Sequence, residues 1–487
     1  MPFISIVILS LTALSCAASR ANQQNAIGGI EGKRFETTDQ NLDASLTTRI
    51  RVLNTQHRGL KAELRWVKPT IAAGSDKVGE YILPLTVSLG VSPSQKYLNL
   101  LREKVDSING TVATAPIKNV KDEIFMAAIQ VGGQNFQAAI DTGSSDTWLM
   151  MKGYSCVKPP AWQETLNKLA GMPSCQFGPS YEKSPTFAQI ADRHFNITYA
   201  DGEYATGILG KDDVTLGDVT LKGQTLGFVS SLKWHGDGIS SGNMGLGFPS
   251  ITNAWNGTDP GKDKKGNNVP YAPIFTNLFR QKIIQPYFSI ALNRAAEGPG
   301  MLALGGLPGP PIRHTGKFIR TPMQQLTLTA DRPKPRSEDG FVDYTFYVVR
   351  PDNLLANSVP LSPDVSSLQL IVDSGSRFCH LPKKIVDGLM SQWKPKPKLN
   401  LVGEWEVGCD STPPKLELEF NGSRISFDKK DLVIKLTGDI CTSTIAYAPG
   451  GDGKAKGKWI LGAPFFRSVV AVFDVGAAEM RFADRVR

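Results

Sequence analysis

The sequence is poor in the residues and spacings that mark several common kinds of functional site. It has 6 cysteines and 5 histidines among 487 residues, and it contains neither a CxxC pair nor an HExxH pattern, which excludes the usual zinc and dithiol motifs. It also has no P-loop and no dinucleotide fingerprint. No basic stripe interleaved with aromatic residues accompanies the net charge of +9, so a nucleic-acid-binding protein is the weakest hypothesis. We therefore expect no cofactor, no metal and no nucleic-acid partner, and ordinary surface or structural roles for the histidines.

Long apolar runs are also scarce, and the one that is present lies at residues 3–14. The small residues at 15–19 follow it, as in a secretory signal, although no Lys or Arg precedes the run. We therefore predict a signal peptide at residues 1–19 and a secreted protein, with a vacuolar or lysosome-like compartment as the alternative. The polar residues 484–487 argue against a C-terminal anchor.

The cysteines that follow the predicted signal peptide and the glycosylation triplets fit an exported chain. Local pairing would join Cys156 to Cys175 and Cys409 to Cys441, and would leave Cys379 as a free, buried thiol. Asn-x-Ser/Thr triplets, which also occur by chance, are candidates for glycosylation at Asn109, Asn196, Asn256 and Asn421.

Composition favours β structure in more than one lobe. Apolar residues make up 41% of the chain, and 47 glycines and 32 prolines separate short runs rich in Val, Ile, Phe and Tyr. The length exceeds that of one ordinary core. We expect an all-β protein with two large lobes and processing segments.

Two short segments of the chain nearly repeat each other. Residues 139–145 read AIDTGSS and residues 371–377 read IVDSGSR. Each segment predicts a strand that runs into a tight turn, because glycine permits backbone angles that other residues resist. A single Asp-x-Gly is a common turn, but two copies suggest that two similar halves deliver Asp141 and Asp373 to one place.

Two neighbouring carboxylates cannot easily both ionise, so one member of the pair can act as a base while the other acts as an acid. A water held between Asp141 and Asp373 could then attack a peptide carbonyl without a metal or a covalent intermediate. The flanking residues suit this chemistry: Thr142 and Ser374 can link the turns, Ser144 and Ser376 can donate to the outer carboxylate oxygens, and Gly143 and Gly375 leave N–H groups open. The G-x-S-x-G letters at 238–242 lack the strand and helix of a nucleophile elbow.

Several ordered motifs resemble those of the pepsin-like aspartic proteases. Residues 141–148 resemble the first active-site signature of that family and residues 372–376 the second. Further similar segments are the flap hairpin (197–202 and 206–210), the apolar-Gly segments (244–248 and 459–462), the closing strand (472–474) and the Cys409–Cys441 disulfide. The resemblance runs from about residue 124 to residue 483 and implies a bilobal fold of two β-barrel-like lobes around a substrate cleft.

The resemblance also implies roles for individual residues. Asp141 and Asp373 would share the water and the proton, and Tyr199 would lie at the flap tip, braced by Trp148. Ala200, Asp201 and Gly202 would complete the flap over the substrate. Ala200 replaces the usual glycine, and Asp201 either tolerates a basic substrate side chain or is a solvated turn residue. Two further departures from the family pattern are Arg377 and Cys379.

The leading part of the chain carries most of the excess positive charge. We predict a basic prosegment at 20–119 that inhibits the enzyme in its zymogen and is released by acid. The glycines and prolines at 305–311 suggest a boundary between an N-terminal lobe (120–308) and a C-terminal lobe (309–487), and surface insertions are expected at 255–268 and 330–340.

Taken together, the sequence predicts a monomeric aspartic endopeptidase that acts on proteins or peptides. The alternative is a non-catalytic binding or inhibitor protein on the same fold. Retention of Asp141, Asp373 and Tyr199 argues against that alternative.

Overall fold

The structure is a computed structural model that describes residues 112–487, apart from 121–123, 159–163, 165–174, 201, 235, 265, 327–343, 363–364, 366–367, 401–402, 438–439 and 449–458. The predicted signal peptide, most of the predicted prosegment, Asn109 and the insertion at 330–340 lie outside these residues. Within the described part of the chain, no helix has the length and apolar character needed to cross a membrane.

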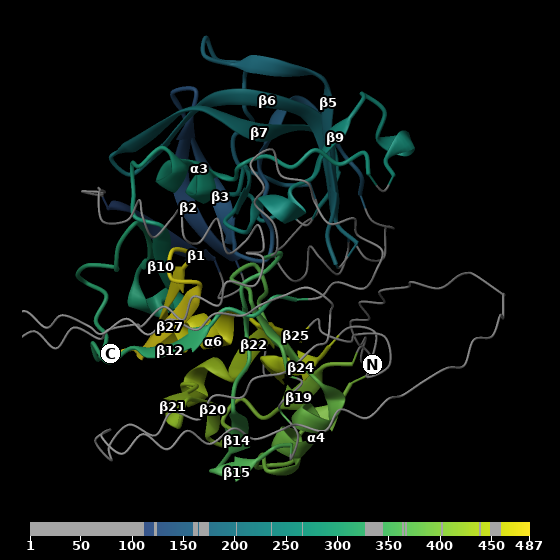
Figure 1. The fold of residues 1–487 in the computed structure, drawn as a ribbon. Helices are drawn as coiled ribbons and strands as arrows, with labels where there is room; N and C mark the ends of the chain where they lie inside the picture. The colour runs from purple at the N-terminus through teal and green to yellow at the C-terminus, as the bar shows by residue number, and fades with distance from the viewer. Residues whose placement is uncertain are drawn as a thin grey trace, which may run out of the picture. The chain divides into compact units, whose positions relative to one another are not determined.

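Strands dominate the described structure, as expected for an all-β protein (Figure 1). Fourteen of them form one sheet in the order β12-β27-β26-β10-β11-β1-β2-β3-β8-β4-β7-β6-β5-β9. These strands are β1 (Ala113–Val120), β2 (Ile124–Val131), β3 (Gln134–Asp141), β4 (Thr147–Cys156), β5 (Ala188–Thr198), β6 (Tyr204–Leu216), β7 (Val219–Lys233), β8 (Gly242–Gly245), β9 (Ala254–Asn256), β10 (Tyr287–Ala291), β11 (Gly300–Leu304), β12 (Ile319–Pro322), β26 (Val469–Asp474) and β27 (Glu479–Asp484).

Three smaller sheets are built from the second half of the chain. The first has the order β13 (Val348–Val349), β16 (Leu370–Val372), β25 (Trp459–Leu461), β17 (Cys379–Leu381) and β24 (Ile445–Tyr447). The second is β15 (Val359–Pro360), β14 (Asn353–Ala356), β20 (Leu416–Phe420) and β21 (Ser423–Ser426), and the third is β18 (Lys398–Leu399), β19 (Trp405–Val407), β23 (Ile440–Ser443) and β22 (Val433–Thr437).

Helices are short in the described residues. They are α3 (Ile274–Arg280), α4 (Lys383–Ser391) and α6 (Ala463–Ser468), with single 3₁₀ turns at η1 (Pro249–Ile251), η2 (Pro260–Lys262), η3 (Ala295–Glu297) and η4 (Lys429–Asp431). Helix α4 buries Ile385, Val386, Leu389 and Met390, a spacing that places all four on one face.

Local sequence explains the hairpin that leads into the first aspartate. Buried and more exposed positions roughly alternate along β3, which gives the strand one face toward the core. Gly132 and Gly133, with φ of 56° and 80°, join β2 to β3, and two such residues form the tight turn that matches the twist of a hairpin. Strand β3 therefore ends at Asp141 with its register fixed.

Strands from both halves of the chain pair in the large sheet. Strands β26 and β27, from the end of the chain, pair beside β10 of the first half, and β12 pairs with β27 (Figure 1). Both halves therefore contribute to one continuous sheet. The predicted boundary between residues 308 and 309, which falls between β11 and β12, stays a prediction.

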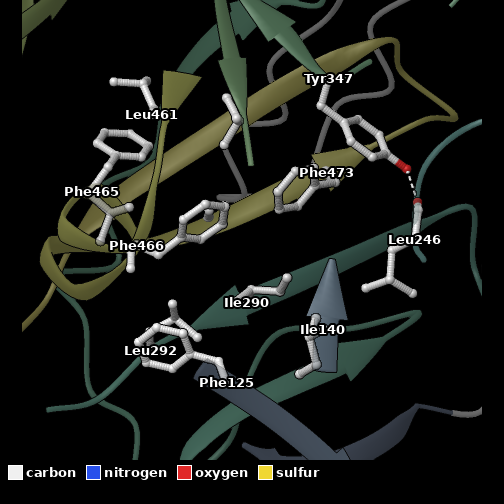
Figure 2. Close-up of a cluster of buried hydrophobic side chains, with 14 of the residues drawn as sticks. Phe125, Ile140, Leu246, Ile290, Leu292, Tyr347, Leu461, Phe465, Phe466 and Phe473 are labelled. Carbon is white, nitrogen blue, oxygen red and sulfur yellow. Dashed lines mark hydrogen bonds between the residues drawn. The ribbon is translucent and has the colours of Figure 1, made fainter. Parts of the chain in front are cut away.

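Buried aromatic side chains pack the two halves together (Figure 2). The rings of Phe288 and Phe473 stack with their centroids 4.4 Å apart, and Tyr347 packs against Phe473 at 4.7 Å. The Tyr347 hydroxyl donates a hydrogen bond of 2.7 Å to the Leu246 carbonyl. A buried aromatic side chain contributes about 1.5–3 kcal/mol through burial alone, so this cluster is a main stabilising contact near the end of β3.

We expect Phe473→Ala to lower the free energy of unfolding by about 3–5 kcal/mol, because a large side chain is removed from a fully buried site. Urea unfolding would measure the change. The exposed Val359 provides a control, since Val359→Ala should change stability by no more than about 0.5 kcal/mol. A loss below about 1 kcal/mol for Phe473→Ala would contradict the packing described.

Candidate active site

The two aspartate turns have the same strand arrangement in each half. Asp141 ends β3, which runs parallel to β8, and β4 pairs with the other side of β8. Asp373 follows β16, which runs parallel to β25, and β17 pairs with the other side of β25. The apolar-Gly segments noted in the sequence therefore supply the neighbours of both aspartate strands.

Thr142 and Ser374 link the two turns in both directions. The Thr142 N–H donates to Ser374 Oγ at 3.1 Å, and the Ser374 N–H donates to Thr142 Oγ1 at 2.9 Å. Each hydroxyl then donates across to the opposite strand, Thr142 to the Val372 carbonyl at 2.8 Å and Ser374 to the Ile140 carbonyl at 2.9 Å. All four bonds are buried, so the contact holds the turns in one relative position.

The glycines bring the carboxylates close to each other. A methyl group built on Gly143 would lie 2.5 Å from Asp373 Cγ, and one on Gly375 would lie 2.6 Å from Asp141 Oδ1. Each turn therefore lies directly against the carboxylate of the other half. Gly143 N–H donates to Asp141 Oδ1 at 2.8 Å, and Gly375 N–H donates to Asp373 Oδ1 at 2.9 Å.

The two serines of the turns do not play equivalent parts. Ser144 Oγ donates to Asp141 Oδ2, as expected from the sequence. Ser376 Oγ instead donates to the Phe378 carbonyl at 3.0 Å, which differs from the expected bond to Asp373. The Ser376 hydroxyl therefore satisfies a carbonyl two residues along the chain rather than the carboxylate.

The electrostatic environment of Asp373 favours its neutral form. Burial, and then the charge on Asp141, raise the pKa of Asp373 well above its ordinary value, while the N–H groups of Gly375 and Gly143 act in the opposite direction. Asp373 therefore keeps its proton at a pH at which an isolated aspartic acid would have lost it. The pair can act as one acid and one base.

Tyr199 lies at the end of the hairpin that β5 and β6 form. Its N–H donates to the Glu203 carbonyl at 2.8 Å, and the Gly202 N–H donates to the Tyr199 carbonyl at 3.1 Å. Gly202 adopts a φ of 86°, whereas Ala200 is exposed and has no positive φ. The alanine therefore fits the turn without strain, because Gly202 takes the unusual conformation. Asp201 lies outside the described residues.

Trp148 supports Tyr199, as the resemblance implies. Its Nε1–H donates to the Tyr199 hydroxyl at 2.9 Å. Burial, followed by the charge on Asp141, raises the pKa of Tyr199 well above 10, while hydrogen bonds with Trp148 and Ser144 oppose the rise. The phenol therefore remains neutral next to the aspartate pair.

Sequence reasoning missed Trp234, which completes this aromatic group. The Trp234 ring meets Trp148 edge-on at 5.2 Å and Tyr199 edge-on at 4.9 Å. Trp234 directly follows β7, whose final residue, Lys233, pairs with Tyr204 next to the flap turn. The contact therefore depends on a strand register that the sequence alone does not give.

Asp146 also received no role from the sequence, although it belongs to the first motif. It is fully buried and accepts hydrogen bonds from the N–H of Asn253 at 2.9 Å, from the Asn253 amide at 2.7 Å and from the Tyr271 hydroxyl at 2.7 Å. Burial and the nearby Asp146 raise the pKa of Tyr271 well above 10. Asp146 fixes the segment that leads from the first turn into β4.

Arg377 and Cys379, the two departures from the family pattern that follow Asp373, have well-defined surroundings in the structure. The Arg377 guanidinium lies 4.4 Å from the centre of the Phe378 ring, and its Nη2 lies 3.8 Å from Glu404 Oε1. Cys379 is buried and accepts the Gly462 N–H at 3.3 Å. Burial raises the pKa of Cys379 to about 12, so its thiol stays protonated and has a structural role.

Both predicted disulfides are present in the structure. Cys156 is bonded to Cys175, and Cys409 is bonded to Cys441. The second disulfide joins the loop after β19 to β23.

We expect Gly143→Ala to abolish hydrolysis and to destabilise the fold by about 1–3 kcal/mol, because the added methyl group would push the Asp373 carboxylate away. Gly309→Ala is the matched control, since a methyl group there meets no atom within 4 Å. Peptide hydrolysis and thermal unfolding would be measured for both variants. Activity near the wild-type level in Gly143→Ala would show that the turns are less closely apposed than described.

Comparisons with known proteins agree with this geometry. A family model described as eukaryotic aspartyl protease matches residues 124–485. A probable aspartic-type endopeptidase of Aspergillus fumigatus is 35% identical over 370 residues, which cover 74% of this chain and 78% of that protein. Rhizopuspepsin of Rhizopus chinensis is 25% identical and covers 76% of this chain and 81% of its own.

A solved structure shows the same fold. The aspartic proteinase from Irpex lacteus superposes with a TM-score of 0.58 at 17% sequence identity, over 77% of this chain and 98% of that one. The bilobal, all-β pepsin-like architecture expected from the sequence is thereby confirmed. The chain belongs to the eukaryotic aspartyl protease family and is an aspartic-type endopeptidase, a hydrolase of peptide bonds.

Proposed function

We propose that the protein hydrolyses peptide bonds in proteins with a water that Asp141 and Asp373 activate together. The observation that carries the proposal is the apposition of the two turns, in which Thr142 and Ser374 exchange hydrogen bonds and hold the carboxylates against each other. The raised pKa of Asp373 supports different roles for the two groups.

In the proposed reaction Asp141 acts as the base and Asp373 as the acid. Asp141 takes a proton from the water, whose oxygen bonds to the peptide carbonyl carbon while Asp373 donates its proton to the carbonyl oxygen. The tetrahedral diol then returns one proton to Asp373, and Asp141 passes its proton to the amide nitrogen as the C–N bond breaks. Both carboxyl groups regain their starting states.

Tyr199 would cover the substrate during this reaction. Trp148 and Trp234 hold the Tyr199 side chain by a hydrogen bond and by edge-on packing. The ring therefore keeps its orientation when the hairpin tip closes over an extended peptide. Closure excludes bulk water, which strengthens the electrostatic interactions at the carboxylates. Apolar side chains beside the cleaved bond would suit such a site.

The remaining parts of the proposal concern activation and location. Residues 20–119 would act as a basic prosegment that inhibits the enzyme until acid protonates its carboxylate partners. We also propose export of a monomeric protein, with a vacuolar or lysosome-like compartment as the alternative.

Glycosylation is proposed at some of the predicted sites and not at others. Asn256 is exposed, which suits an attached glycan. Asn421 is exposed too, but its amide donates to the Arg320 carbonyl at 2.9 Å and would have to give up this bond on modification. The amide of the half-buried Asn196 donates to Asp263 Oδ2 at 2.7 Å, which opposes modification there. Peptide mapping of protein from a eukaryotic host would compare the occupancy of the three sites.

We expect Asp141→Asn to lower peptide hydrolysis by about 10²–10⁴-fold, the usual contribution of a general base. Protein lacking residues 1–19 would be acidified, and its N-terminal processing and its cleavage of an unfolded protein would be followed with and without pepstatin. Asp218→Asn, in an exposed turn, is the control and should retain activity. A folded wild type that cuts no faster than Asp141→Asn would refute the proposal.

We expect Asp373→Asn to be more stable than the wild type at neutral pH, although it is inactive. Because the pKa of Asp373 is raised in the folded state, the free energy of unfolding falls as pH rises from about 4 toward the raised pKa. This loss of stability persists at every pH above the raised pKa. Asparagine carries no such penalty and can still accept the Gly375 N–H. Urea unfolding at pH 3 and pH 7 should show the stability difference only at pH 7, and a wild type that remains the more stable protein at pH 7 would contradict the raised pKa.

A further inference from the structure

The surface insertion expected at 255–268 contacts the flap strand directly. Strand β9 pairs antiparallel with β5, with Arg193 opposite Asn256, His194 opposite Trp255 and Phe195 opposite Ala254. Tyr199 follows the last residue of β5, so the strand that carries the flap tip has the insertion along its base.

His194 makes buried side-chain contacts with the insertion. It is 3% exposed, its Nδ1 lies 2.8 Å from the Gly257 carbonyl oxygen, and its Nε2 lies 3.0 Å from Oδ1 and 3.2 Å from Oδ2 of Asp263. Asp263 Oδ2 also accepts the Asn196 amide at 2.7 Å. Asp263 Oδ1 accepts no hydrogen bond among the described residues. The His194 ring, 3.0 Å away, is therefore the group that can stabilise the charge on this oxygen.

Both ring nitrogens of His194 thus face oxygen acceptors. A neutral imidazole has one N–H and can donate to only one of them, whereas the imidazolium ion donates to both. Loss of the proton would leave one buried oxygen without a donor and would remove the positive charge beside Asp263. Such a loss is costly because water cannot replace the missing donor in a buried contact.

Few other charges face this histidine among the described residues. Strand β6 places the apolar Ile208 opposite it. The insertion contributes Asp263 and Asp259, and Asp259 pairs with Lys262 at 3.3 Å. Further charges on β5 and the insertion are Asp192, Arg193 and Lys264. The acidic partner closest to the ring is Asp263, so protonation of His194 strengthens the contact.

The backbone carries this contact toward the flap tip. Trp255 Nε1–H donates to the Asn196 carbonyl at 2.9 Å, and the Asn196 N–H donates to the Asn253 carbonyl at 3.2 Å. Phe195 is fully buried and pairs with Ala254. His194, Phe195 and Asn196 are therefore fixed to the insertion and to the two residues that precede it, and Asn196 lies three positions before Tyr199.

We propose that His194 is a positioning residue that, through Asp263 and the Gly257 carbonyl, holds the flap strand and Tyr199 in place for substrate binding. The proposal rests on the proposed protease function for its effect on catalysis. It assigns a role to an insertion and a histidine that catalysis by the aspartate pair does not require.

The test compares the wild type with His194→Gln and with the control His314→Gln, whose ring lies on another segment and accepts the Gly316 N–H. We would measure kcat and KM for one peptide substrate at a single acidic pH. In His194→Gln, KM should rise about tenfold, the scale of one hydrogen bond to a charged group, whereas the KM of the control should match that of the wild type. The kcat of His194→Gln should stay close to that of the wild type, because the aspartate pair is unchanged.

Hydrogen exchange of the amides of residues 193–199, measured at one pH for every protein, provides a readout that needs no activity. Protection should be lower in His194→Gln than in the wild type and the control, and lower also in Asp263→Asn, which serves if the first variant fails to fold. Equal protection in the wild type and a folded variant would overturn the proposal. If the wild type cuts no peptide, the proposed function fails, while the exchange measurement still decides the role of His194.

Discussion

The contact between Thr142 and Ser374 is the constraint on which the site depends. Two turns from distant parts of the chain exchange two hydrogen bonds, and each hydroxyl donates a further bond to the strand opposite. Because all of these groups are buried, a shift of either turn would leave several polar atoms unpaired. The bonds thus fix the separation of Asp141 and Asp373, and the raised pKa of Asp373 follows from that separation and from burial.

Bringing two carboxylates together destabilises the fold, so other contacts must offset the cost. The stacked rings of Phe288 and Phe473 provide dense packing between the halves, and so does the bond from Tyr347 to Leu246 that Figure 2 shows. Leu246 follows β8, the strand parallel to the one that ends at Asp141, so the same packing also supports the first turn. Stability of the core and acid–base chemistry at the site are therefore physically coupled.

The motif residues could be predicted from the sequence because their chemistry is local. Asp141, Gly143, Asp373 and Gly375 lie in two short segments that repeat each other, and the repeat indicated a shared site. The structure gives a different reason for the glycines: neither has a positive φ, and each lies against the carboxylate of the opposite turn. Ser376 could not be placed in the same way, since the direction of a hydroxyl depends on the path of the backbone after the turn.

Partners far apart in the sequence were equally out of reach. Trp234 lacks a motif and contacts Tyr199 only through the hairpin register, and His194 meets Asp263 across 69 residues. A single sequence contains no signal for contacts of that range between surface segments. The flap hairpin was indicated by its resemblance to the family motif, but the strand that pairs with β5 along its base was not.

The position of these unpredicted contacts has a physical logic. A hairpin that admits a substrate must be able to change at its tip, so strong contacts there would oppose opening. Contacts at its base do not carry this cost, and they limit the directions in which the tip can move. In this protein the tip is built from the exposed Ala200 and from Gly202 with a positive φ, whereas the base carries the buried His194, Phe195 and the bond from Trp255. The insertion therefore adds order at the base of the hairpin, three positions before Tyr199.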